Sequence, residues 1–170
     1  MQKIPMLVLA GLVSTLAACQ SMPDGPRASA MLEARSASSV AGEVSFTPAG
    51  DEMIVRARLS GLKPGGEHGF HVHDKGDCSA ADASSAGGHF NPASTAHGHY
   101  GMGNHHAGDL PNLKADGEGK AVYEARVGML ALSGANGIVG RSVVVHRDAD
   151  DYKSQPAGNS GPRIACGVIR

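Results

Sequence analysis

The stretch Gly69-Phe70-His71-Val72-His73 places two histidines at alternate positions of the chain. In a β-strand, successive side chains point to opposite faces, so this spacing sends both imidazoles to the same face. The stretch therefore predicts a strand over residues 67–73 that carries two nitrogen ligands side by side.

More potential ligands follow in separate segments of a chain that has nine histidines. His106 is followed three residues later by Asp109, and His146 ends the strand-like run Ser142-Val143-Val144-Val145-His146. The candidate ligands are His71, His73, His89, His97, His106, Asp109 and His146. These six nitrogen donors and one oxygen donor are enough for two metal ions if one histidine is shared.

Short strand-like runs separated by turn residues predict an all-β antiparallel sandwich or flattened barrel. The expected strands are 28–34, 40–46, 53–59, 67–73, 120–125, 127–132 and 141–146. Two long segments, 74–113 and 147–162, lack this pattern, and loops of that length in a compact domain are usually functional or disordered. Four of the seven candidate ligands lie in the first loop, so we expect bound metal to order this loop.

Length and charge narrow the class of protein. A chain of 170 residues fits one domain with a core, and 24 glycines with no tryptophan suit a loop-rich β protein. A formal net charge of −1 provides no electrostatic footprint for nucleic acid, so no nucleic-acid partner is expected.

The N-terminus reads as an export signal over residues 1–18, with Lys3 before an apolar run that is too short for a comfortable membrane span. Leu16-Ala17-Ala18-Cys19 resembles the bacterial lipobox, which predicts acylation of Cys19. The alternative is an ordinary signal peptide with an incidental cysteine. Residues 19–27 then form a lipidated tether, and residues 28–170 form the domain.

Three cysteines are an odd number for an exported protein. If Cys19 carries lipid, Cys78 and Cys166 remain, and an oxidising compartment allows them to form a disulfide. Two buried free thiols are the alternative.

Imidazole ligands suit copper and zinc. His71, His73 and His146 lie on strand-like segments and offer a rigid nitrogen platform, whereas the other ligands lie in the long loop. His89 stands between the two groups in sequence and has two nitrogens, so it can bind one metal through each. Taken singly, each residue has a plainer role, as a hydrogen-bonded strand histidine or, for Asp109, a turn residue.

At this point the chain resembles the copper/zinc superoxide dismutases, in their exported bacterial lipoprotein form. The matching segments, in order, are Gly69–His73, Gly76–Cys78, Gly88–Pro92, His97-Gly98, His106–Leu110, Gly140–His146 and Gly161–Val168. The resemblance covers residues 28–170 and implies a Greek-key β-sandwich with two long functional loops.

The resemblance implies a role for each matching residue, with one copper and one zinc ion per chain. Copper ligands are His71, His73, His89 and His146, and zinc ligands are His89, His97, His106 and Asp109. It further implies a Cys78–Cys166 disulfide, a structural role for His68, and Arg163 beside copper to attract and orient superoxide. Asp150 corresponds to a carboxylate that links a copper-site histidine to a zinc-site histidine, with Asp151 as the competing choice. His99 and His105 have no assigned role, and a one-residue shift would exchange His105 with His106.

The implied activity is dismutation of superoxide to oxygen and hydrogen peroxide, in which His89 takes and returns a proton. The expected partners are superoxide as substrate and a membrane bound through lipid on Cys19, with a homodimer as one expected association. The expected location is the cell envelope or periplasm, including the outer membrane. The rivals are a non-catalytic copper-binding or copper-delivery lipoprotein and an envelope anchoring protein with structural metals. Arg163 and an intact His89 favour the enzyme, because storage requires neither.

Overall fold

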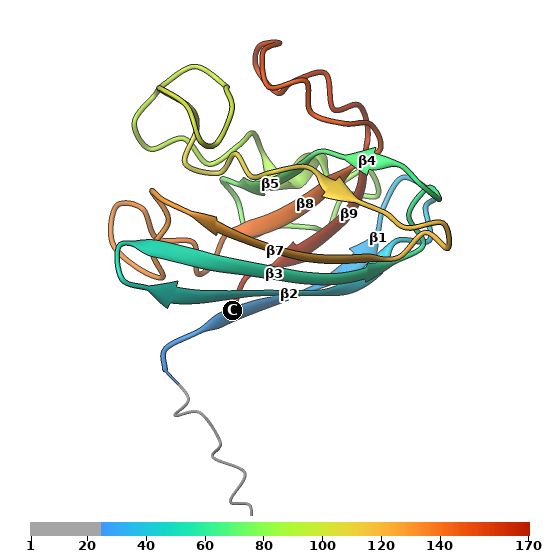
Figure 1. Cartoon of the computed structure of the whole chain (residues 1–170), viewed down its shortest axis with the longest axis horizontal. Helices are drawn as coiled ribbons and strands as arrows, with labels where there is room; N and C mark the ends of the chain where they lie inside the picture. Colours follow the sequence, from blue (N-terminus) through green and yellow to red (C-terminus); the bar gives the residue numbers. More distant parts are fainter. Residues whose placement is uncertain (1–24) are drawn as a thin grey trace, which may run out of the picture.

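The computed structural model describes residues 25–170, and its main element is a seven-stranded antiparallel sheet (Figure 1). The strand order is β5-β8-β9-β1-β2-β3-β7, and β4 and β6 form a separate pair. The strands are β1 (Ala28–Ala34), β2 (Ala41–Ala49), β3 (Glu52–Ser60), β4 (Glu67–His68), β5 (Phe70–His73), β6 (Leu113–Lys114), β7 (Ala121–Val127), β8 (Ser142–His146) and β9 (Arg163–Val168). Among the described residues the one helical element is a 3₁₀ turn, Ser84–Ala86.

The sheet curls on itself because β1 changes partner along its length. Its residues 28–32 pair with β2, and Glu33 and Ala34 pair with β9. One half, β1-β2-β3-β7, therefore lies against the other, β5-β8-β9, as Figure 1 shows. Within the seven-stranded sheet, β3 and β5 follow one another along the chain but lie in different halves, which produces the crossing connections of the expected sandwich. The predicted all-β fold is confirmed.

Strand β3 shows how alternation builds the core. Its arginines, Arg56 and Arg58, are exposed on the outer face. Its core-facing side chains are at most 4% exposed: Met53, Val55, Ala57 and Leu59. Apolar burial of this kind contributes roughly 25 cal/mol for each Å² removed from water, so a change of register would move the whole set into solvent.

The same alternation places the first two ligands outside the core. Phe70 and Val72 of β5 join the core cluster, so His71 and His73 project from the opposite face of the sheet. The loop after β5 covers that face, where Ala83 and Ala86 pack on Val144 of β8. Both faces of β5 and β8 are therefore buried.

Several sequence-based boundaries are wrong. The predicted strand 127–132 does not exist: β7 continues to Val127, and Met129 has a left-handed φ of 63° that a strand does not allow. The predicted strand 67–73 is broken at Gly69, where an added Cβ would lie 2.6 Å from Ser160 Oγ. Strands β6 and β9 were not expected from strand pattern.

The core, the disulfide and both ligand groups lie within residues 28–169, so residues 25–170 form a self-contained folding unit. No helix within this described part is long and apolar enough to cross a membrane. Cys19 and the predicted signal, residues 1–18, lie outside the described residues, as does most of the predicted tether.

Candidate metal centre

Four histidines from three segments bring nitrogen atoms to one place: His71, His73, His89 and His146. In each of the three strand histidines, one ring nitrogen is occupied by a hydrogen bond. His71 Nε2–H donates to Asp150 Oδ2 (2.8 Å), His73 Nδ1–H to Gly87 O (2.9 Å) and His146 Nδ1–H to Gly161 O (3.1 Å). Such bonds fix the tautomer, so the lone pair belongs to the other nitrogen.

The remaining nitrogens of this group converge. His146 Nε2 lies 3.4 Å from His73 Nε2. His71 Nδ1 and His89 Nε2 are buried and have no hydrogen-bond partner among the described residues. Buried polar atoms are almost always satisfied, so these orphaned lone pairs fit a bound cation. Four imidazole nitrogens suit copper, and the residues present therefore fit this metal.

Burial keeps these imidazoles neutral, which is the state that binds metal. Desolvation and the neighbouring imidazoles lower the pKa of His71 to about 3 and that of His146 to about 4, against partial compensation from their hydrogen bonds. The pKa values of His73 and His89 are lowered mainly by the same desolvation. A metal therefore meets little competition from protons at this group near neutral pH.

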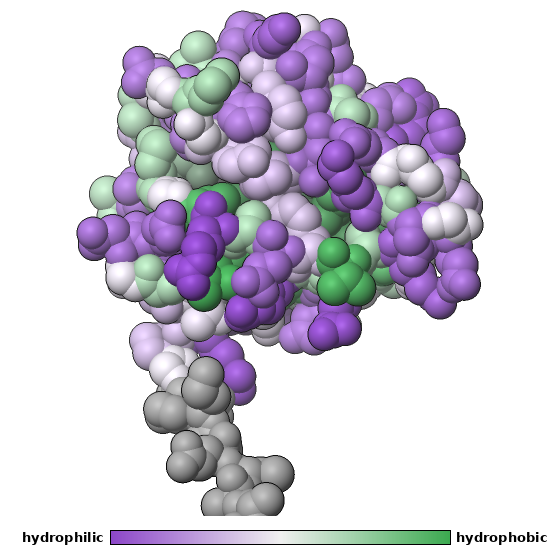
Figure 2. Space-filling model, viewed as in Figure 1, coloured by the Kyte–Doolittle hydropathy of each residue, from purple (hydrophilic) through white to green (hydrophobic). Residues whose placement is uncertain are grey.

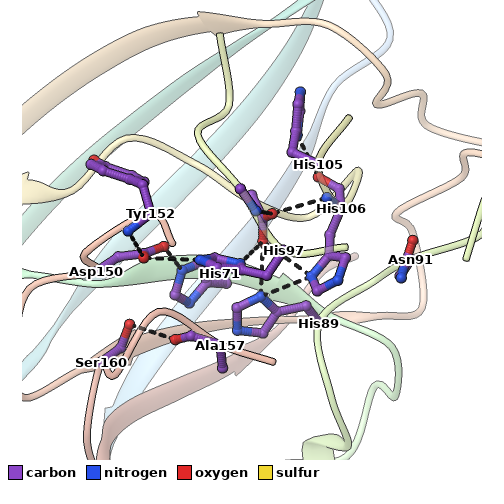
Figure 3. A network of polar contacts seen from close by, with 12 residues as sticks. His71, His89, Asn91, His97, His105, His106, Asp150, Tyr152, Ala157 and Ser160 are labelled. Atoms are coloured by element: carbon purple, nitrogen blue, oxygen red, sulfur yellow. Dashed lines mark hydrogen bonds and ion pairs between the residues drawn. The ribbon is translucent and has the colours of Figure 1, made fainter. Parts of the chain in front are cut away.

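A second group is built around one carboxylate oxygen. Asp109 Oδ1 lies 2.8 Å from His89 Nδ1, 3.1 Å from His97 Nδ1 and 3.4 Å from His106 Nδ1. Three nitrogens and one oxygen provide four ligands of types that zinc binds, and four is its coordination number in structural sites. Figure 3 shows His89, His97 and His106 turned toward one another around this point. His89 thus contributes Nδ1 here and Nε2 to the first group.

Charge in the second group is concentrated on Asp109. Burial raises the pKa of Asp109, but hydrogen bonds from the three imidazoles outweigh burial and hold this pKa far below its usual value. Burial alone would lower the pKa of His97, but hydrogen bonds and charge attraction from Asp109 and Asp150 outweigh burial and raise this pKa to about 9. Without metal His97 is therefore a cation between two carboxylates, whereas zinc replaces that proton.

Asp150 joins the two groups. One carboxylate oxygen accepts from His71 Nε2 and the other lies 3.0 Å from His97 Nε2 (Figure 3). The competing Asp151 instead accepts from the Ser154 and Lys153 backbone within its own loop. Carboxylates in this position orient ligand rings and are worth 10- to 100-fold in metal affinity.

A close approach of the long loop to β5 sets the loop ligands in place. Phe90 N–H donates to Val72 O (2.8 Å), and Val72 N–H donates to Gly108 O (2.9 Å). A Cβ on Gly108 would collide with the Val72 carbonyl, so this approach requires glycine. The contact brings His89 and Asp109 beside the strand histidines.

Arg163 and the disulfide hold the other end of the loop. Arg163 donates to Ala83 O (2.6 Å) and Gly87 O (2.6 Å), and Gly87 O also accepts from the copper-group histidine His73. Cys78 and Cys166 form a disulfide with Cα atoms 5.7 Å apart, which ties the loop to β9. The disulfide, left open by the cysteine count, is confirmed.

The unassigned histidines lie outside both groups. His105 Nδ1–H donates to His106 O (2.7 Å), so His106 and not its neighbour is the zinc-group ligand. His99 stacks on Tyr100 with ring centroids 4.4 Å apart. His68 Nδ1–H donates to His146 O (2.9 Å), which agrees with its expected structural role.

Two amide side chains were missed from the sequence although they hold the loops together. Asn112 brackets Asp150: its Oδ1 accepts from Asp150 N–H (2.9 Å) and its Nδ2–H donates to Asp150 O (2.9 Å). Gln155 brackets His97 in the same way, with both bonds 2.9 Å long. Each of the two long loops therefore hydrogen-bonds the backbone of a residue in the other loop. Neither amide belongs to a ligand motif, so no sequence signal marked them.

The fold and these two ligand groups define a β-sandwich protein with two metal sites that share a histidine. Residues 40–169 match the family described as copper/zinc superoxide dismutase (SODC). The chain belongs to the copper/zinc superoxide dismutase family, and it retains both metal sites intact.

Similar sequences come from the same family. The chain is 43% identical over 136 residues to a superoxide dismutase [Cu-Zn] of Paramecium bursaria Chlorella virus 1, covering 76% of this chain and 72% of that protein. It is 42% identical over 137 residues to that of Caulobacter vibrioides, covering 76% and 78%.

Two solved structures have a similar fold. The clock protein EA4 superposes with a TM-score of 0.77 at 40% identity, covering 87% of this chain and 98% of that one. A double mutant of a SOD-like protein from Bacillus subtilis gives a TM-score of 0.74 at 37% identity, covering 82% and 94%.

Proposed function

We propose that this copper/zinc superoxide dismutase protects the cell envelope from superoxide, with Arg163 and His89 as its catalytic residues and a lipid on Cys19 as its anchor. The observation that carries the catalytic part is the placement of His89, whose two nitrogens belong to different ligand groups. Storage of copper alone requires no such shared residue.

Copper, when bound, supplies the alternating one-electron oxidation and reduction that converts two superoxide anions into oxygen and hydrogen peroxide. His89 would hold one proton at Nε2 between the two half-reactions and give it to the second anion, and solvent water would supply the second proton of hydrogen peroxide. Asp109 and the zinc-group histidines keep His89 Nδ1 in place meanwhile, so the ring does not turn away. The proton therefore returns along one path.

Arg163 binds and orients the anion. Its guanidinium is always charged and can donate to an anionic substrate. Hydrogen bonds to Ala83 O and Gly87 O fix its direction, and Gly87 also holds His73. The cation is therefore positioned relative to the copper group before substrate arrives, which removes an ordering cost.

The test is a dismutation assay on metal-loaded protein with metal analysis of the same samples. His89→Ala abolishes dismutation at neutral pH, whereas Arg163→Ala retains copper and zinc but loses roughly tenfold or more in rate through lost anion orientation. Undiminished activity of metal-loaded His89→Ala contradicts the shared-histidine mechanism. Arg163→Lys, which keeps the charge but not the fork of donors, separates attraction from orientation.

The envelope location rests on the lipobox-like segment before Cys19. Acylation at this position, followed by a short tether, places the domain just off a membrane surface. Cys19→Ser releases the protein from the membrane fraction without changing dismutation by the folded domain. Membrane association that survives this change removes the anchor from the proposal.

A homodimer is also part of this proposal. Met129 and Val139, both between β7 and β8, are 40% and 53% exposed and are available for apolar association. Sedimentation measured over a range of protein concentration distinguishes a dimer from a monomer. A constant monomer mass excludes it.

A further inference from the structure

A hollow of about 540 Å³ lies on the outer face of the sheet, away from both metal groups. The outward-facing small residues Ser29 of β1 and Ser45 of β2 line it. Its charged lining residues are Arg27, Glu43, Arg56, Arg58 and Arg170. We call this hollow the arginine groove.

Arginines outnumber carboxylates among the residues that line the arginine groove, four to one. Arg56 pairs with Glu124 at 2.8 Å. Glu43, the carboxylate among the lining residues, lies opposite Arg58 in the pairing of β2 with β3. Arg58 and Arg170 are exposed, and within the described part of the chain no ion pair or side-chain hydrogen bond engages either guanidinium. Two arginines without an ion pair among the described residues therefore line the hollow.

The groove lies where the chain enters the domain. Arg27, which lines it, directly precedes β1 and comes only eight positions after Cys19 in the sequence. In Figure 1 this entry is at the lower edge, whereas the loops that carry the zinc ligands and Asp150 lie along the upper edge. In Figure 2 hydrophilic side chains lie among a few strongly hydrophobic ones over this part of the viewed face.

We propose that the arginine groove is a membrane-facing surface that docks on anionic phospholipid headgroups and turns the metal centre away from the bilayer. The inference rests on the proposed anchor, because lipid on Cys19 brings this face to the membrane. Arg58 and Arg170 bind headgroup phosphates, for which guanidinium donors are well suited. Docking holds the copper group on the side of the domain that faces away from the membrane. An anionic membrane close to the copper group would repel the superoxide anion.

Charge sets the expected size of the effect. Each arginine near an anionic bilayer contributes about 1 kcal/mol, or about fivefold in binding. Removal of both uncommitted arginines therefore weakens binding about 25-fold. The interaction is modest and salt-sensitive, so it orients a protein that is already anchored.

The experiment uses residues 25–170, the self-contained folding unit, and phosphatidylcholine vesicles with and without phosphatidylglycerol. Because this domain carries no acyl chain, the result is independent of Cys19 and of the anchor. We expect binding to the anionic vesicles that falls as salt rises, and weak binding to the neutral ones. The double variant Arg58→Gln/Arg170→Gln binds the anionic vesicles about 25-fold more weakly, with unchanged dismutation because neither residue approaches a ligand group.

Arg126→Gln is the matched control. Arg126 is exposed on β7, pairs with Glu52 at 3.6 Å and lies outside the groove, so this variant loses one positive charge elsewhere on the sheet. We expect it to change binding by no more than about twofold. Equal binding to neutral and anionic vesicles overturns the proposal, as does a loss in Arg126→Gln equal to that in Arg58→Gln alone. Binding of inorganic phosphate without anionic vesicles also overturns it, by assigning the groove to a small anion.

Discussion

The two ligand groups are positioned by different physical means. Strands hold three of the four copper-group histidines, and His71 and His73 inherit their direction from the β-sheet ladder. The zinc group takes its ligands from the long loop, where Asp109 and polar contacts between loops fix them. The copper group is therefore held as rigidly as the core, whereas the zinc group depends on a few polar bonds. Changes to the loops should then weaken zinc binding more than copper binding.

Asp109→Ala is expected to give the largest difference between the loss of zinc affinity and the loss of copper affinity. This change removes the charged centre on which three imidazoles converge, so zinc affinity falls more than about a hundredfold, beyond the usual effect of an outer carboxylate. Copper affinity falls far less, because Asp109 is not a copper-group ligand. Chelator competition for each metal measures both.

Asp151→Ala is the control for this prediction, since Asp151 bonds only within its own loop among the described residues. Equal losses of copper and zinc affinity in Asp109→Ala would show that the groups do not differ in the way described.

Removal of the disulfide is the next largest change. The Cys78→Ala/Cys166→Ala variant lowers the free energy of unfolding by about 4 kcal/mol, because the bond closes a long loop in the unfolded chain. The same variant frees the loop from β9, so zinc retention suffers more than copper retention. Urea unfolding of the metal-free protein checks the stability, and a loss below about 1 kcal/mol would contradict it.

Asp150→Asn tests the link between the two groups. The amide keeps the shape but can donate and is neutral, so it no longer orients both His71 and His97. Zinc affinity falls about 10- to 100-fold. Copper affinity falls less, because β5 still directs His71. Isothermal titration with each metal measures the difference, and a larger loss for copper would reverse the comparison.

Gln155→Ala gives the smallest expected effect. It removes two hydrogen bonds to the His97 backbone, which together contribute about 1.4 kcal/mol. Zinc therefore dissociates about tenfold faster, with copper dissociation unchanged. Asn159→Ala is the control, because Asn159 bonds to Asp151 and Ser154 within the same loop. Equal zinc dissociation in both variants would show that Gln155 does not position His97.

The sequence predicts the elements whose pattern is local. The alternation in β3 and in 70–73 agrees with the structure: the apolar side chains face the core, and His71 and His73 face the metal groups. Strand β9 has no such alternation, because Ile164 to Gly167 are buried on both faces. Gly167 further weakens the strand signal, yet a Cβ there would collide with the Met31 carbonyl.

The ligand assignments could be predicted because motifs occur in order, but the supporting contacts could not. Asn112 and Gln155 act on backbone groups of the opposite loop, and that pairing exists only after both loops fold. Arg163 was expected beside copper from resemblance. Its bonds to Ala83 and Gly87 depend on the disulfide-anchored turn, which no local pattern reveals.

The shared histidine is the centre of this account, and copper spectroscopy tests it most directly. The electron paramagnetic resonance spectrum of the chain loaded with one copper is recorded before and after one equivalent of zinc is added. Because His89 belongs to both groups, zinc should change the copper spectrum, and His89→Gln should abolish this response while copper remains bound. A copper spectrum that is indifferent to zinc in the unaltered chain would contradict the account.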